Sequence, residues 1–274
     1  MSEYLQLITE IYDRLDKKTE QDFFINNSDF ERLEEHNLWT YWQGRGVRHP
    51  KIMVVGQDWG SLEQSKKYFE YIKNHPNEKV VSYEQVKKEN PKMSYREFTT
   101  DRELRNFFNK YLGYADICEN QYKDLYFTNL VPGFRNDSSS TRNGTELQME
   151  IPDIINDFIR LLNILHPEFI LCLGKLVSES IDKAYNGEKS VIDKAKNYNE
   201  YLDEALHADS PQPITLDLGN GNYAKMFALA HMGGLGKSNR TRYYKDKPNK
   251  KTVIDDWEVV ADYINGVYKS RLYD

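Results

Sequence analysis

Residues 52–60 read Ile-Met-Val-Val-Gly-Gln-Asp-Trp-Gly, a short apolar run that ends in a glycine turn and a carboxylate. Three more apolar runs have the same form and lead into Asn129, Gly174 and His231, at residues 125–128, 169–173 and 226–230. Short continuous apolar runs are typical of buried parallel strands, which need crossover helices between them. The sequence therefore predicts a three-layer α/β/α domain around a central, mainly parallel, four-stranded sheet.

Helical patterns fill the stretches around these runs, at residues 1–16, 104–112, 152–165, 176–185 and 253–268. We expect a single domain over residues 1–274. It carries a helical N-terminal extension at 1–46 and two polar insertions, at 61–100 and 186–213, of which the first could act as a flap over the strand ends.

Composition excludes several classes of protein. The 274 residues include two cysteines, too few for an iron–sulfur cluster or a four-thiolate zinc site, and Cys172 lies in an apolar run. No apolar run approaches the roughly 20 residues of a membrane span, and the N-terminus lacks an apolar targeting core. We therefore expect a cytoplasmic monomer without a membrane partner. The net charge of −6 argues against a protein that coats nucleic acid, but not against a local DNA site.

The ends of the four runs form the predicted site, because ligands of open α/β sheets bind at the carboxyl edge. Asp58 could polarise a water or stabilise a cation, or it could merely cap a helix or bond its own turn. The amide of Asn129 has the donors and acceptor that read a base edge, or it forms the turn before Pro132. His231 could stabilise an anion as a donor, or it is a structural residue.

Residues 231–238 read His-Met-Gly-Gly-Leu-Gly-Lys-Ser and nearly match the phosphate-binding pattern G-x-x-x-x-G-K-S. His231 replaces the first glycine, and no apolar stripe follows Lys237, so we expect no helix there, which argues against a nucleotide hydrolase. The other interpretation is DNA contact, in which Gly233 and Gly234 approach a phosphate and Leu235 is a wedge. The nearby cations would hold the DNA backbone, unless they only solvate a loop: Lys237, Arg240, Arg242, Lys245, Lys247, Lys250 and Lys251.

Taken in order, these motifs resemble those of the uracil-DNA glycosylase superfamily. Gly56-Gln57-Asp58 resembles its water-activating motif, and Phe127-Thr128-Asn129 resembles the strand whose Asn reads the flipped base. Residues 230–235 resemble its His-Pro-Ser-Pro-Leu loop, with Leu235 in the place of the intercalating leucine, and residues 169–174 resemble a core strand and turn. Order and approximate spacing agree over residues 50–240.

The resemblance implies a DNA glycosylase that flips a nucleotide and hydrolyses the N-glycosidic bond of uracil or a modified pyrimidine, without metal or other cofactor. Asp58 would position water and stabilise the oxocarbenium-like sugar, Asn129 would read the base, and His231 would stabilise the departing base anion. The rest of the base site would comprise Gln57, Trp59, Gly60 and a stacking ring, Phe98 or alternatively Phe69. The expected partner is single- or double-stranded DNA, in repair or in defence against phage.

Two departures from the family bear on specificity. Trp59-Gly60 stands where the uracil-specific branch has Pro-Tyr, whose Tyr blocks the thymine methyl, so a base that is bulky at C5 is a possible substrate. The loop after His231 lacks both prolines of the family and should be more flexible. The alternative function is a non-catalytic module of the same fold that binds nucleic acid or protein, motivated by the net charge and this degenerate loop.

Overall fold

The computed structural model describes residues 3–18, 49–57, 67, 70–78, 83–91, 99–115, 117, 123–131, 143–245, 247 and 250–266. Within them, one five-stranded sheet has the order β2-β1-β3-β5-β4. Its strands are β1 (Ile52–Gly56), β2 (Leu125–Asn129), β3 (Phe169–Leu173), β4 (Ile214–Asp217) and β5 (Tyr223–Leu229). All pair in parallel except β4, which is antiparallel to β5. The predicted α/β architecture is confirmed, whereas the predicted number of four strands was wrong.

The extra strand, β4, gives only a weak signal in the sequence. It is four residues long and lies at the edge of the sheet, where only Leu216 is buried. The other four strands each carry a continuous buried run, and three of them are buried at every position. An apolar run therefore identifies a strand that is buried on both faces but misses a short edge strand with one face in solvent.

Five of the nine described helices fall where the sequence predicts a helix, and four were not predicted. They are α1 (Glu3–Lys18), α4 (Tyr83–Glu89), α5 (Thr99–Leu112), α7 (Asn143–Leu165), α8 (Lys175–Asn186), α9 (Val191–Lys194), α10 (Tyr198–Leu206), α11 (Gly234–Tyr243) and α12 (Val253–Ile264), with a 3-10 turn η2 (Gly187–Lys189). The helix α7 begins nine residues before the predicted start at residue 152, and α5 begins five before residue 104. Residues 19–48 of the predicted N-terminal extension lie outside the described residues.

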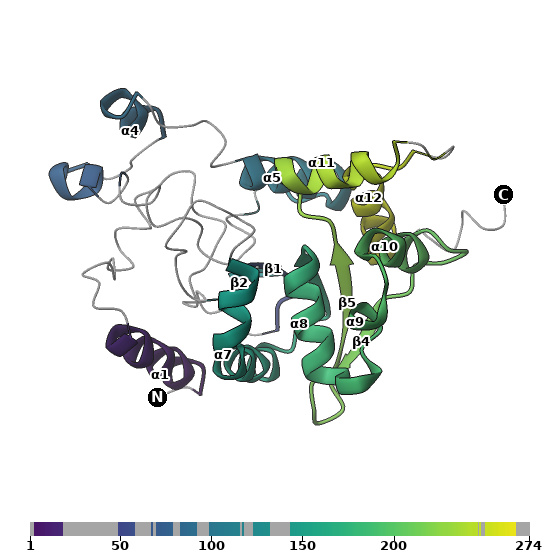
Figure 1. Ribbon diagram of the computed structural model, residues 1–274. Helices are drawn as coiled ribbons and strands as arrows, with labels where there is room; N and C mark the ends of the chain where they lie inside the picture. Colours follow the sequence, from purple (N-terminus) through teal and green to yellow (C-terminus); the bar gives the residue numbers. More distant parts are fainter. Residues whose placement is uncertain are drawn as a thin grey trace.

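Helices cover both faces of the sheet (Figure 1). On one face, Phe108 of α5 packs 5.6 Å from Phe127, and Tyr263 of α12 packs 5.2 Å from Phe227, measured between ring centroids. On the other face lie α1, α7 and α8; the hydroxyl of Tyr4 in α1 is 3.2 Å from that of Tyr126 in β2. The result is the three-layer arrangement that the sequence predicts.

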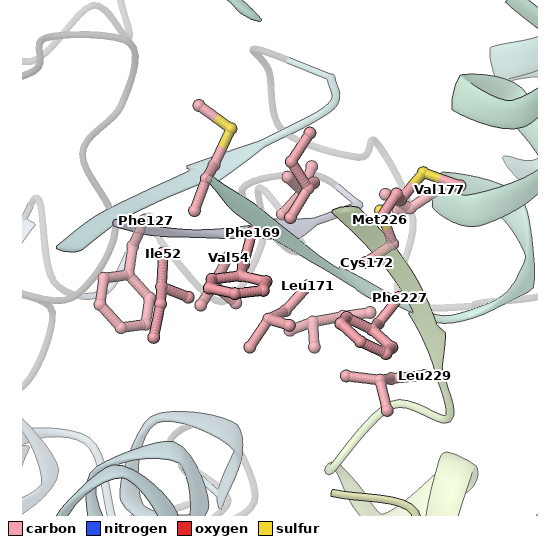
Figure 2. Packing of buried hydrophobic residues seen from close by; sticks show 14 of the residues in the cluster. Ile52, Val54, Phe127, Phe169, Leu171, Cys172, Val177, Met226, Phe227 and Leu229 are labelled. Carbon is pink, nitrogen blue, oxygen red and sulfur yellow. The ribbon is translucent and has the colours of Figure 1, made fainter. Parts of the chain in front are cut away.

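Alternate residues of each strand enter one of two apolar layers (Figure 2). Val54, Phe127, Leu171 and Phe227 point to one side of the sheet, and Cys172 and Met226 point to the other, toward Val177 of α8. All of these side chains are at most 3% exposed. The predicted burial of Cys172 is confirmed, and burial raises the pKa of its thiol well above the usual range.

Two segments expected to lie outside the core framework are part of it. Residues 186–213, predicted as an insertion, form η2, α9 and α10, and their Ile192, Leu202 and Leu206 belong to the apolar core. The segment after His231, expected to lack a helix, forms α11 at once. An apolar stripe is not what holds α11; a buried arginine does, as described below. Among the helices in the described part of the chain, none has both the length and the apolar composition for a bilayer crossing.

Candidate functional site

The carboxyl ends of β1, β2, β3 and β5 meet at one edge of the sheet, as the sequence predicts. Gly56 is the register partner of Asn129, and pairing continues past both strands. The N–H of Leu130 donates to the carbonyl of Gly56, and the N–H of Val131 donates to that of Gln57, both at 2.9 Å. Gln57 is half-buried at this edge. Asp58, Trp59 and Gly60, which follow it in the chain, lie outside the described residues.

Asn129 is a buried polar residue at the end of β2, which is an edge strand of the sheet. It is 4% exposed, and its register partner is Gly56 of β1. A side-chain amide at this position can both donate hydrogen bonds to a ligand and accept them from it. Strand alternation puts Asn129 on the sheet face of Phe127, the face that α5 covers.

His231 follows β5, and a backbone hydrogen bond indicates which ring nitrogen carries the proton. Its Nδ1 accepts a hydrogen bond from the backbone N–H of Gly233 at 2.9 Å. Because a backbone N–H can only donate, Nδ1 carries no proton, and a neutral ring then carries its proton on Nε2. In this tautomer Nε2–H is the donor of the half-buried ring, the form suited to stabilising an anion.

Asn129 and His231 lie at this edge of the sheet on strands that are not neighbours. Their strands, β2 and β5, are separated by β1 and β3. Three strand spacings put the two residues about 14 Å apart at the backbone.

The first turn of α5 lies close to His231 at this edge of the sheet. A Cβ placed on Gly233 would lie 3.2 Å from the hydroxyl of Thr100, and Glu103 forms an ion pair with Lys237 of α11 at 2.9 Å. Figure 1 shows α5 and α11 side by side at this end of the molecule. The proposed stacking ring, Phe98, immediately precedes α5 and lies outside the described residues, as does the alternative, Phe69.

The cations predicted to hold DNA differ in how far they are exposed to solvent. Arg242 is exposed, and Lys237, about one-third exposed, is paired with Glu103. The prediction for Arg240 was wrong: its side chain is fully buried against Asp203 and Asp256 and cannot reach a phosphate. Burial by itself would lower the pKa of this guanidinium, but the hydrogen bond and charge of Asp256, with the charge of Asp203, raise it.

The glycine-rich segment differs from a phosphate-binding loop. Only residues 230–233 lie between β5 and α11, too few to encircle a phosphate, and the N–H of Gly233 is already bound to His231. Gly234 is the first residue of α11, and among the described residues no neighbouring atom lies within 4 Å of a Cβ placed on it. Leu235 follows in the first turn, and its side chain is outside the described part. The helix is thus present, but without the loop that a nucleotide hydrolase needs.

Gly236 has a role that sequence reasoning missed. A Cβ on this residue would overlap the carbonyl oxygen of His231 and lie 2.7 Å from its carbonyl carbon. The first turn of α11 therefore packs directly on the backbone of His231, which only glycine permits. The spacing of three glycines within four residues was the available signal, but it suggested phosphate contact rather than close packing of two backbone segments.

Within the described residues, no group of three or more His, Cys, Asp or Glu side chains could hold a metal ion. No protein-family model matches this chain, and no curated protein sequence matches it either.

Proposed function

We propose that this chain is a DNA glycosylase of the uracil-DNA glycosylase type, which hydrolyses the N-glycosidic bond of uracil or a modified pyrimidine after base flipping. The observation that carries the proposal is the state of His231, a ring whose Nδ1 is held by Gly233 so that Nε2–H is the donor, at the edge that also ends in Asn129. A donor of this kind suits a reaction in which a base leaves as an anion.

The proposed reaction breaks the bond between C1′ of the sugar and the base nitrogen. The electron pair of that bond leaves with the base, and the resulting oxygen anion accepts a hydrogen bond from Nε2–H of His231. Asp58 positions the water and stabilises the cationic sugar. The water adds its oxygen to C1′ and gives a proton to the Asp58 carboxylate. Asn129, a buried amide at the end of β2, supplies hydrogen bonds to the base edge.

Base release from oligonucleotides tests the proposal directly. We expect a uracil-containing strand, or one with a C5-substituted pyrimidine, to become alkali-labile after treatment, with unmodified DNA as the control. Because Trp59-Gly60 lacks the tyrosine of the uracil-specific branch, the panel should include pyrimidines with small and large groups at C5. No abasic product from any base, together with measurable DNA or protein binding, would instead support the non-catalytic module.

We expect His231→Asn to slow base release about 100-fold, because it removes the donor to the leaving base. Single-turnover rates on the best substrate of the panel give the measurement. His49→Asn is a matched control, since His49 lies just before β1 at the opposite edge of the sheet, and its left-handed backbone (φ 64°) suits asparagine. Equal rates for His231→Asn and the unsubstituted protein would contradict the assigned role.

A further inference from the structure

Arg240 ties α11 to two other helices. Its Nε and Nη2 donate to the two carboxylate oxygens of Asp256 in α12, at 2.9 and 2.8 Å. Nη2 also donates to Asp203 of α10 at 2.7 Å, and Nη1 donates to the carbonyl of Asn199 at 3.0 Å. Because the guanidinium is planar and its donors have fixed directions, these contacts define both the rotation and the axial position of α11.

The position of α11 depends on these polar contacts because the helix has little apolar surface. Among its described side chains, only Arg240 is buried. The next buried side chain is that of Tyr244, directly after the helix, whose hydroxyl donates to Asp203. Loss of the arginine fork would therefore leave α11 with few other contacts that fix where it lies.

The first turn of α11 in turn fixes His231. Gly236 packs on the His231 carbonyl, and Gly233 donates to Nδ1. On the other side of His231, the indole N–H of Trp257 in α12 donates to the carbonyl of Ala230 at 3.4 Å. Trp257 adjoins Asp256, and both are fully buried. Adjacent residues of α12 thus act on both sides of His231. Trp257 binds the residue before it, and Asp256 holds the helix after it through Arg240.

We propose that Arg240 is a positioning residue for His231. Through Asp256 and Asp203 it seats α11 so that the N–H of Gly233 meets Nδ1, which keeps the ring in one orientation with Nε2 as donor. The catalytic meaning of this inference rests on the proposed function. The positioning itself is a property of the folded chain and can be measured without a substrate.

The test is Arg240→Lys, which keeps the charge but loses the planar fork. We expect a folded sheet by circular dichroism, together with ¹⁵N NMR signals of the His231 ring that move from one fixed tautomer toward the average of two. Exchange of the Gly233 amide hydrogen should become about tenfold faster as its hydrogen bond weakens. On the best oligonucleotide substrate, kcat should fall about tenfold with KM unchanged.

Arg160→Lys is the matched control, because Arg160 pairs with Glu10 at 2.8 Å on the surface of α7 and should leave the His231 signals unchanged. If Arg240→Lys does not fold, Asp203→Asn removes one partner at a partly exposed position and keeps the Asp256 pair, with the same change expected at smaller size. Unchanged His231 signals in a folded variant would overturn the inference. Absence of base release by the unsubstituted protein would overturn the proposed function and leave this result intact.

Discussion

Replacing Gly236 with alanine should lower the free energy of unfolding by about 3 kcal/mol, at the upper end of overpacking effects. The added methyl group would overlap the carbonyl oxygen of His231, a backbone atom that cannot rotate away. Relief requires a shift of α11 or of the His231 backbone. Since a displacement of about 1 Å can cost about 100-fold in rate, base release should fall by roughly that factor.

Gly234→Ala is the control within the same helix turn. A methyl group there would meet no heavy atom of the described part of the chain within 4 Å, and alanine favours helix over glycine by up to about 1 kcal/mol. We therefore expect Gly234→Ala to be neutral or slightly stabilising, opposite in sign to Gly236→Ala. Chemical denaturation of both variants measures the difference. Equal stability of the two would show that α11 does not pack on His231 as the structure has it.

The largest expected effect on activity comes from Asp58→Asn, which should reduce base release about 1,000-fold. The amide has nearly the shape of the carboxylate but lacks its negative charge, so it cannot stabilise a cationic sugar or accept a proton from water. Single-turnover base release on a uracil or C5-substituted strand gives the rate. Fluorescence anisotropy with the same strand should show that DNA binding is retained.

Asp209→Asn is the matched control for this substitution. Asp209 is exposed in the segment between α10 and β4 and is not part of the candidate site, so its loss should leave the rate unchanged. Full activity of Asp58→Asn would contradict the role assigned to the carboxylate. Equal loss in both variants would indicate a general effect of charge on the affinity for DNA.

Apolar runs were enough to predict β1, β2, β3 and β5, because burial on both faces leaves a strong local pattern. Residues 169–173 form β3 as predicted, and β1 and β2 begin where their runs begin. The edge strand β4 was missed since only one of its residues is buried. The helix α11 was missed for a related reason, because its buried contact is a charged residue whose partners are distant in the sequence.

The candidate site divides in the same way. The positions of Asn129 and His231 at the carboxyl edge follow from the ends of their runs, and the topology brings those ends together. The hydrogen bond that leaves Nε2 of His231 as the donor could not be predicted, since it depends on the local backbone path through Gly233. The roles of Asp58, Trp59 and Gly60 remain predictions from the sequence.

The sequence by itself determined the parallel sheet and the polar residues at its edge, because burial and alternation are local patterns. Only the tertiary structure decided what the cations after His231 do. A charge read from sequence predicts an exposed contact, yet Arg240 is buried by carboxylates 37 and 16 residues away, in Asp203 and Asp256. Whether an arginine faces a phosphate or a carboxylate depends on which helices pack around it, and that is settled only when the chain has folded.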